Sequence, residues 1–357
     1  MRSILRKILS PHIIGVIRDK LEALDKLLVV LCSKHRYLAS FYYCFLSRRF
    51  DREHYSVLTG RKTYWEQLAN PSNSSVMLRR NVHRVEKGLI MQPRREVFGL
   101  AFIQETVACY KRCVNGDNVN QQELKWAHDV LSKYFLAVAA GKSEVVDGAR
   151  AMFNDIAAKY STEKEFSPYS YQSLEKASVS FEQFKQLCVQ RRSVRWFKDQ
   201  PVPRELINQA LSAATLAPSA CNRQPFEFFV FDKVEEAREI GAIPMGTAGF
   251  SHNFQCVLVV VGDLAAYPYE RDRHVIYIDG SLASMQLMLA LETLGLSSCV
   301  INWPDVENLE REMSKKLSLK ANQRPLMVLS IGYADDKGMI PYSQKKDVNE
   351  LVKEVSL

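Results

Sequence analysis

Apolar residues recur with two different periods along the chain, and the change of period divides the sequence into two regions. Over residues 1–178 the apolar positions follow helical spacing nearly throughout, which predicts amphipathic helices at 98–112, 121–140 and 143–159. From Phe181 onward, short apolar runs alternate with helical segments. We therefore expect a mostly α-helical N-terminal region over residues 1–178 and a second domain over residues 179–357, with a linker around 167–170.

The second region has the pattern of an α+β domain. Four apolar runs have the length and composition of buried strands: residues 227–231, 256–262, 298–301 and 326–333. Helical segments are predicted at residues 204–216, 277–294 and 306–317, with Pro203 and Gly295 in the positions that proline and glycine favour at helix ends. Segment 277–294 is apolar on nearly all sides, which indicates a helix at the centre of the assembly.

Positive charge is concentrated at one end of the chain. The net charge is +8; residues 1–62 contain 13 Lys and Arg against 5 Asp and Glu, whereas the other residues contain 35 of each sign. A basic end favours contact with anionic lipid head groups, an acidic partner or nucleic acid, and a solvated basic surface is an equal alternative. We expect no nucleic acid partner, because the region has no recognised motif and long apolar stretches interrupt its charge.

Two segments of the basic end, residues 4–17 and 21–46, have an amphipathic pattern. They would lie on a membrane surface or, as we slightly favour, pack against the rest of the protein. No stretch approaches the ~20 uninterrupted apolar residues of a membrane span, and the start lacks the features of a secretory signal. We therefore expect a cytoplasmic protein. The alternative is a cytoplasmic protein with peripheral contact at the inner membrane face.

A second basic patch lies at residues 78–88, where cations surround His83 and the patch ends at Gly88, the expected C-cap of a helix. One interpretation makes the patch an anion site or part of a substrate pocket. A solvated basic helix face is the interpretation that we favour. His83 alone is expected to be a structural histidine rather than a catalyst.

Several common kinds of site are missing from the sequence. It contains no G-x-G-x-x-G after a strand, no P-loop, no nucleophile elbow and no HExxH helix. The eight cysteines are scattered without a CxxC pair, so we expect reduced thiols, no metal site and no disulfide framework. Any cofactor for redox chemistry must therefore be bound by a different motif.

The most informative stretch covers residues 191–225. It begins with a cluster of cations and a hydroxyl group, formed by Arg191, Arg192, Ser193 and Arg195. It closes with a loop of short polar residues that includes Pro218, Ser219, Asn222 and Gln224. Guanidinium groups bind phosphate in a bidentate fashion, and small amide and hydroxyl groups can bond the edge of a heterocycle. The pattern indicates a site for a phosphorylated, planar cofactor.

In this order and spacing, the two pieces resemble the flavin-binding signature of the nitroreductase family. Residues 290–296 resemble the end of the family's central helix, and residues 330–333 with the later basic pair resemble its closing strand and tail. The resemblance covers roughly residues 181–357 and assigns no role to residues 1–178. It implies an α+β fold with a mixed sheet flanked by helices around a long central helix. It also implies a homodimer with exchanged C-terminal segments and FMN at the interface.

The resemblance further implies a role for each residue of the signature. The group 191–195 would take the phosphate and ribityl chain of FMN, with Lys345 or Lys346 as an additional cation, and the loop residues at 218–224 would line the isoalloxazine. Three residues after the third strand would approach the other side of the flavin: Ile301, Asn302 and Trp303. No catalytic side chain is implied, because the flavin carries the chemistry and the protein orients it.

Three functional hypotheses follow. The first is an FMN-dependent oxidoreductase that passes electrons from NAD(P)H to a small organic substrate by a ping-pong mechanism. The second is a dehydrogenase-type flavin enzyme that works without a nicotinamide. The third is a non-catalytic flavin-binding scaffold that its basic N-terminus docks at the membrane. Cys221, Arg223 and Trp303 depart from the family's usual residues, which weakens the case for nitroaromatic reduction as the native activity.

Overall fold

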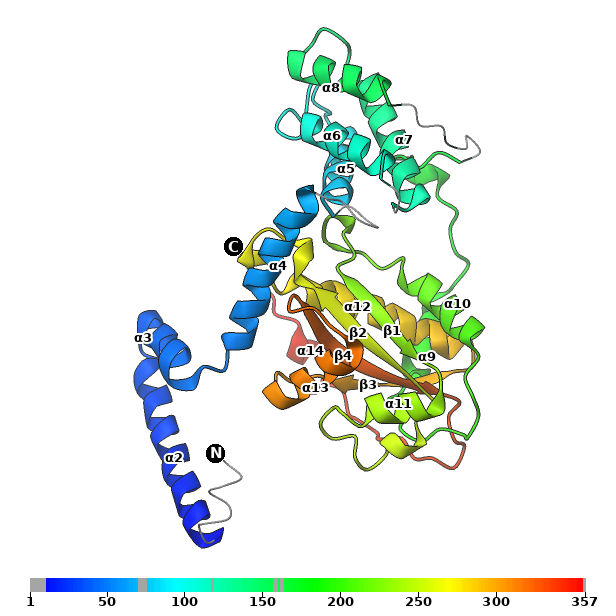
Figure 1. Ribbon diagram of the computed structural model, residues 1–357. Helices are drawn as coiled ribbons and strands as arrows, with labels where there is room; N and C mark the ends of the chain where they lie inside the picture. The colour runs from blue at the N-terminus through cyan, green and yellow to red at the C-terminus, as the bar shows by residue number, and fades with distance from the viewer. Residues whose placement is uncertain (1–10, 70–75, 117–118, 157–159, 161–163, 356–357) are drawn as a thin grey trace. The chain divides into compact units, whose positions relative to one another are not determined.

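A computed structural model describes the chain except for residues 1–10, 70–75, 117–118, 157–159, 161–163 and 356–357 (Figure 1). The chain divides into two compact units, Met1–Val57 and Leu58–Leu357. Helix α4 (Asp51–Ala69) begins in the first unit and continues into the second. The predicted domain boundary at residues 178 and 179 stays a prediction.

The first unit consists of helices. It contains α2 (Pro11–Cys32), α3 (Arg36–Phe41) and the π-helix η1 (Tyr42–Ser47), followed by the start of α4. The expectation of separate segments at 4–17 and 21–46 is wrong for the described residues, because α2 runs through residues 18–20, where Arg18 and Asp19 are exposed. The break comes after Cys32, where the His35 side chain accepts a hydrogen bond from the backbone N–H of Tyr37 and caps α3. Residues 4–10 lie outside the described residues.

The N-terminal part of the second unit is a helical bundle with a core of its own. After α4 it contains α5 (Val76–Leu89), α6 (Ile103–Val114), α7 (Gln121–Ala137) and α8 (Glu144–Asn154). The predicted helices at 98–112, 121–140 and 143–159 are therefore confirmed, with shorter or shifted ends. Their apolar faces pack together around fully buried aromatic and aliphatic side chains such as Tyr110, Leu131 and Tyr134.

Gly88 does not cap α5, because the helix continues to Leu89. A Cβ atom at Gly88 would lie 2.3 Å from the ring of Phe98, so the glycine allows the chain after the helix to fold back against it. The prediction of a C-cap at this residue is wrong: the glycine serves packing rather than helix termination.

The C-terminal part contains a four-stranded sheet in the order β1-β2-β4-β3, and all paired strands are antiparallel. The strands are β1 (Phe226–Phe231), β2 (Cys256–Asp263), β3 (Ser297–Asn302) and β4 (Gln323–Gly332), so all four predicted strands are confirmed. β4 begins before the predicted apolar run, because its first residues, which are polar, still pair with β2. A bulge between Val260 and Val261 of β2 interrupts this pairing, at the point where Pro325 lies opposite. The parallel component of this sheet region is an isolated bridge between Ser193 and Ser298.

Helices cover both faces of the sheet, which confirms the α+β fold class (Figure 1). α11 (Val234–Gly241) and α13 (Glu307–Leu317) pack on one face through Ala237, Ile240 and Met313. α12 (Val275–Thr293) lies on the other face; a Cβ atom at Gly280 would lie 2.6 Å from Leu326, so the glycine allows close contact with the sheet. This part also contains α9 (Phe181–Gln190), α10 (Arg204–Ala214), α14 (Val348–Leu351) and several short 3-10 helices.

The long apolar helix predicted at 277–294 is α12. With the turn before it, at Glu270–Thr293, it is long and apolar enough to cross a membrane by length and composition. Ile276, Leu287 and Leu291 of this helix are fully buried inside the protein. α12 is therefore the central helix of the fold, as its composition predicts.

Candidate functional site

The arginine segment, residues 191–195, leaves the C-terminal end of α9 in an extended conformation. Arg191 is the C-cap of that helix, and the Val194 N–H then donates to the Ser298 carbonyl at the start of β3. Val194 and Phe197 are buried in the core on the sheet face, whereas the side chains of Arg191, Arg192, Ser193 and Arg195 are half-buried. Val194 and Phe197 therefore anchor the segment in the core, while its polar groups stay accessible.

The three guanidinium groups of this segment have no carboxylate ion pair with any residue that the structure describes. Arg195 donates to the Ser193 carbonyl at 3.4 Å and lies over the ring of Phe250. Arg192 donates to the carbonyl of Pro341 at 2.7 Å and to that of Tyr342, which holds the C-terminal tail beside the segment. Glu292 is the carboxylate that acts electrostatically on Arg191, so three cations face one negative charge, and the segment fits a phosphate group.

Buried polar atoms beside the segment support that fit. The Gln190 amide donates to Glu292 Oε2 at 3.3 Å, while Glu292 Oε1 and the hydroxyl of Ser298 are buried without a hydrogen-bond partner among the described residues. Burial raises the pKa of Glu292, partly offset by hydrogen bonds from Gln190 and Ser297 and by the positive charge of Arg191. Burial also raises the pKa of Cys299, against the opposing effect of Arg195. Unsatisfied polar atoms at one place indicate a site that a ligand or water completes.

The cofactor loop, residues 218–224, is held in a different way. Protein groups bond the Ser219 hydroxyl and the Gln224 side chain, whereas Nε of Arg223 is buried without a hydrogen-bond partner among the described residues. The Ser219 hydroxyl donates to Asp279 Oδ2 at 2.7 Å and accepts from the backbone N–H of Gln224 at 2.7 Å. The N–H of Ala220 also donates to Asp279 Oδ2, at 2.9 Å. Asp279 is buried on α12 and therefore ties the loop to the central helix. Pro218 is exposed at the start of the loop.

Asp279 belongs to no part of the predicted site, although the sequence contains a signal for it. It is an acidic residue in the first half of a helix that is otherwise mostly apolar. A buried carboxylate in such a helix needs hydrogen-bond donors, and here the donors are the loop itself.

The loop also contacts the helical bundle through Arg79, in the basic patch at residues 78–88 that one interpretation of the sequence makes an anion site or part of a substrate pocket. Arg79 of α5 donates through Nε to the Asn222 carbonyl at 2.9 Å and through Nη2 to Gln224 Oε1 at 3.1 Å. Its Nη1 donates to Glu123 Oε2 of α7 at 2.9 Å. A pocket of about 330 Å³ lies at this junction and is lined by Arg79, Asn120, Gln122, Glu123, Trp126, Phe166 and Asn222.

The favoured interpretation of the patch at residues 78–88 as a solvated helix face is wrong. Leu78, Val82 and Val85 are fully buried, and the arginines at 79, 80 and 84 are half-buried. The guanidinium of Arg84 lies 3.7 Å from the ring centroid of Phe102. The spacing of arginines along a helix is the same whether their side chains stack inside the protein or lie in solvent. The sequence therefore could not distinguish a solvated helix face from a pocket. His83 is half-buried beside Glu86, at 3.2 Å.

The remaining predicted site residues lie in two other places. Ile301 and Trp303 are buried in the core on the sheet face, where the Trp303 indole donates to Glu310 Oε1 at 2.7 Å, and the side chain of Asn302 is exposed. Lys345 and Lys346 are exposed on the tail that follows the Arg192 contacts. Ile301 and Trp303 share the core cluster of Val194, and the roles predicted for these five residues stay predictions.

The arginine segment and the cofactor loop lie at opposite ends of α12. Glu292 is next to the segment and Asp279 holds the loop. The two are thirteen residues apart on one helix, which corresponds to about 20 Å at 1.5 Å per residue. Within one chain, the two groups are therefore separate, and we call them the two half-sites of the predicted cofactor site.

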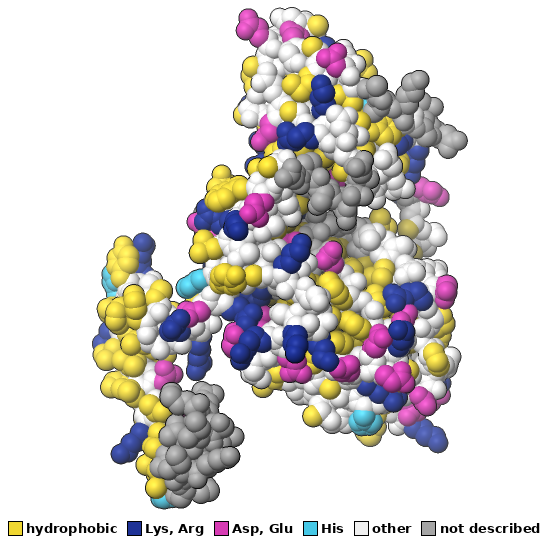
Figure 2. All heavy atoms as spheres, viewed as in Figure 1, with side chains coloured by type: hydrophobic (Ala, Val, Ile, Leu, Met, Phe, Trp, Pro, Cys, Tyr) yellow, Lys and Arg dark blue, Asp and Glu magenta, His cyan; other side chains and the backbone are white. Residues whose placement is uncertain are grey.

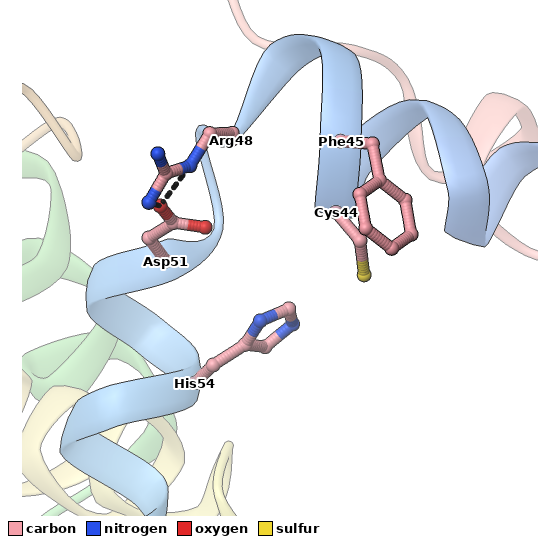
Figure 3. Close-up of a pocket in the computed structure, with 5 residues that line it drawn as sticks. All are labelled: Cys44, Phe45, Arg48, Asp51 and His54. Atoms are coloured by element: carbon pink, nitrogen blue, oxygen red, sulfur yellow. Dashed lines mark hydrogen bonds and ion pairs between the residues drawn. The ribbon is translucent and has the colours of Figure 1, made fainter.

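A second pocket, in the first unit, has a different character (Figure 3). It has a volume of about 570 Å³ and is lined by Cys44, Phe45, Arg48, Asp51 and His54. Arg48 and Asp51 form an ion pair at 2.8 Å, so its strongest charges are paired. Figure 3 shows the side chains of Cys44 and Phe45 on η1 and that of His54 on α4. The described residues contain no group of three His, Cys, Asp or Glu suited to a metal ion, here or elsewhere.

Comparison with known proteins gives matches to the C-terminal part of the chain. The model of the nitroreductase family matches residues 188–248 and 244–333. A protein of Archaeoglobus fulgidus with the provisional name NADH dehydrogenase/NAD(P)H nitroreductase is 31% identical over 150 residues, which cover 41% of this chain and 83% of that protein. An iodotyrosine deiodinase of Danio rerio is 25% identical, over 52% of this chain and 72% of its own. The solved structure of an FMN-dependent nitroreductase from Clostridium difficile R20291 is 26% identical, with a TM-score of 0.40, and covers 47% of this chain and 96% of that chain.

Proposed function

Because this chain belongs to the nitroreductase family of oxidoreductases, we propose that it binds FMN and passes electrons from NAD(P)H to a small organic substrate. The observation that carries the proposal is the arginine segment, whose three half-buried guanidinium groups have no carboxylate ion pair among the described residues. A phosphate with a charge near −2 would supply the counter-charge that Glu292, beside Arg191, does not.

The residues of the chain would divide the work of holding the cofactor. Arg191, Arg192 and Arg195 would bind the phosphate together with the Ser193 hydroxyl, and Lys345 or Lys346 would add a cation from the tail, which Arg192 already holds nearby. Ser219, Asn222 and Gln224 would present the cofactor loop to the ring system. The flavin, when bound, supplies the electron transfer, so no protein nucleophile is required. In the ping-pong order, NAD(P)H leaves before the electron acceptor enters the same pocket.

The separation of the two half-sites supports a homodimer. A two-fold axis would place the arginine segment of one protomer beside the cofactor loop of its partner, although the two are about 20 Å apart along α12 in one chain. α12 also exposes Ile278, Leu282 and Met285, an apolar strip that a second copy would cover. The exposed apolar residues of the tail, including Met339 and Tyr342, fit the exchange of C-terminal segments.

The test is the visible spectrum of the purified full-length protein, followed without oxygen while NADH or NADPH is added. A flavin spectrum that is bleached by one of the nucleotides, with FMN released on denaturation, supports the proposal. A flavin that stays oxidised with both nucleotides moves the assignment to the nicotinamide-independent alternative. A protein that cannot be reconstituted with FMN contradicts the cofactor assignment.

We further propose that the first unit docks the enzyme at the surface of an anionic membrane, on the inner face of the cell membrane. α2 exposes a row of large apolar side chains at helical spacing: Ile13, Ile17, Leu24, Leu27 and Leu31. Figure 2 shows hydrophobic side chains gathered over this unit. Residues 1–57 contain 11 Lys and Arg against 5 Asp and Glu, and this positive charge beside exposed apolar side chains fits an anionic lipid surface.

Vesicle flotation tests this docking with the full-length protein. We expect co-flotation with vesicles that contain phosphatidylserine, weaker co-flotation in high salt, and little with phosphatidylcholine alone. Ile17→Glu with Leu24→Glu should abolish flotation, whereas the control Val29→Glu, on the opposite side of α2, should not. Flotation of the double variant equal to wild type contradicts membrane docking. A wild type that instead dimerises through α2 in solution assigns the apolar face to a second copy.

A further inference from the structure

Arg79 is the point at which the helical bundle meets the cofactor loop. Its side chain is 17% exposed, and each nitrogen of its guanidinium group has a separate acceptor: the Asn222 carbonyl, Gln224 Oε1 and Glu123 Oε2. The guanidinium group also lies 5.6 Å from the ring centroid of Trp126, whose indole donates to Glu86 at 2.9 Å. Arg79 is thus fixed by the bundle and bonded to the loop.

The loop needs such a constraint because of its backbone. Cys221, Asn222 and Gln224 all have positive φ angles, of 53°, 51° and 50°. Asparagine tolerates this left-handed conformation, but cysteine and glutamine avoid it, and residues held there persist when surrounding contacts over-determine them. Asp279 fixes the start of the loop, at Ser219 and Ala220, and Arg79 fixes its end.

The chemistry of the contact requires an arginine. The planar guanidinium group donates in three directions at once, which a lysine ammonium group cannot reproduce with the same fixed geometry. Glu123, whose side chain is 4% exposed, compensates the charge of Arg79 inside the protein. The side-chain amide of Gln224 is held through both of its polar atoms. Its Oε1 accepts from Arg79, and its Nε2 donates to the Thr215 carbonyl at 2.9 Å.

We propose that Arg79 is a positioning residue for the flavin site, and that the helical bundle outside the family match controls the cofactor loop through it. The inference rests on the proposed FMN function, and it gives a role to residues that precede the matched region at 188–333. Arg79 acts through Asn222 and Gln224, not by contact with the cofactor. The bundle and the flavin domain are one functional body at this junction, in agreement with their place in the same compact unit.

The test compares Arg79→Ala and Arg79→Lys with the control Arg112→Ala, which removes an exposed arginine of the same bundle with a weak contact of 3.4 Å to the Leu68 carbonyl. For both Arg79 variants we expect FMN affinity about tenfold weaker, equivalent to about 1.4 kcal/mol. At saturating FMN we also expect a changed visible circular dichroism spectrum of the flavin. Arg79→Lys keeps a cation beside Glu123, so its thermal stability should stay closer to wild type than that of Arg79→Ala.

Hydrogen exchange of the flavin-free proteins separates the two levels of the proposal. In both Arg79 variants, the peptide that covers residues 219–224 should exchange faster, while the same peptide in Arg112→Ala should match wild type. If wild type binds no FMN, the proposed function fails, and faster exchange still establishes that Arg79 holds the loop. If wild type binds FMN but the Arg79 variants match it in affinity, flavin spectrum and loop exchange, the inference is overturned.

Discussion

The arginine segment and the cofactor loop differ in how the protein satisfies their polar groups. In residues 191–195, three half-buried guanidinium groups have no carboxylate ion pair among the described residues, and buried oxygen atoms nearby have no partner there. In residues 218–224, the hydroxyl of Ser219 and the amide of Gln224 are bonded to the protein itself. Groups without a protein partner are suited to bind a ligand, whereas bonded groups hold a shape. The segment would therefore supply affinity, and the loop would supply geometry.

The largest expected effect comes from removing the cations of the segment. Arg191→Ala with Arg195→Ala should weaken FMN binding on the order of 1,000-fold, because two charge-assisted contacts to phosphate are lost. The flavin-free protein should be no less stable than wild type, since the like charges repel each other. Fluorescence titration and thermal unfolding measure the two quantities, with Arg311→Ala, an exposed arginine of α13, as the control. Unchanged FMN affinity would show that the phosphate lies elsewhere.

The reverse result is expected for the loop. Asp279→Ala removes the acceptor of the Ser219 hydroxyl and the Ala220 N–H, so the flavin-free protein should lose about 1–3 kcal/mol of unfolding free energy. Asp279→Asn keeps one acceptor oxygen and should lose less. Denaturant unfolding checks both variants. An Asp279→Ala protein as stable as wild type would contradict the claim that hydrogen bonds within the protein hold the cofactor loop in place.

The smallest effect is a pH dependence at Glu292. Burial raises the pKa of this carboxyl group in the folded protein. Its contribution to stability is therefore fully present below the ordinary pKa of about 4.3 and is lost as the pH rises through the raised value. Unfolding of the flavin-free protein between pH 4 and pH 8 should show Glu292→Gln gaining stability relative to wild type as the pH rises. A difference between the two that is constant over this range would contradict the burial effect.

Local pattern was sufficient to predict the sheet and its central helix. The four strands are apolar runs of strand length, and α12 is apolar around most of its circumference, so both signals arise within a few residues. The arginine segment was also predictable, because its cations are adjacent in the chain. Whether these residues bind FMN stays a prediction.

Contacts between distant segments could not be predicted in this way. Arg79 and Asn222 are 143 positions apart, and no periodicity in either region refers to the other. The same limit explains Gly88, whose neighbour Phe98 comes from the chain after the helix and fills the space where a side chain would lie. The side chain of Trp303 packs into the core with Glu310, and its approach to the flavin, which the family resemblance implies, stays a prediction. Such outcomes depend on tertiary packing, which overrides local signals.

The most direct test of the account compares the binding of FMN and riboflavin to the wild-type protein. The two ligands share the isoalloxazine and the ribityl chain, so their difference isolates the phosphate that the arginine segment would hold. We expect FMN to bind on the order of 100-fold to 1,000-fold more tightly, because its phosphate makes several charge-assisted hydrogen bonds. Equal affinities for FMN and riboflavin would contradict the central claim that residues 191–195 bind the cofactor phosphate.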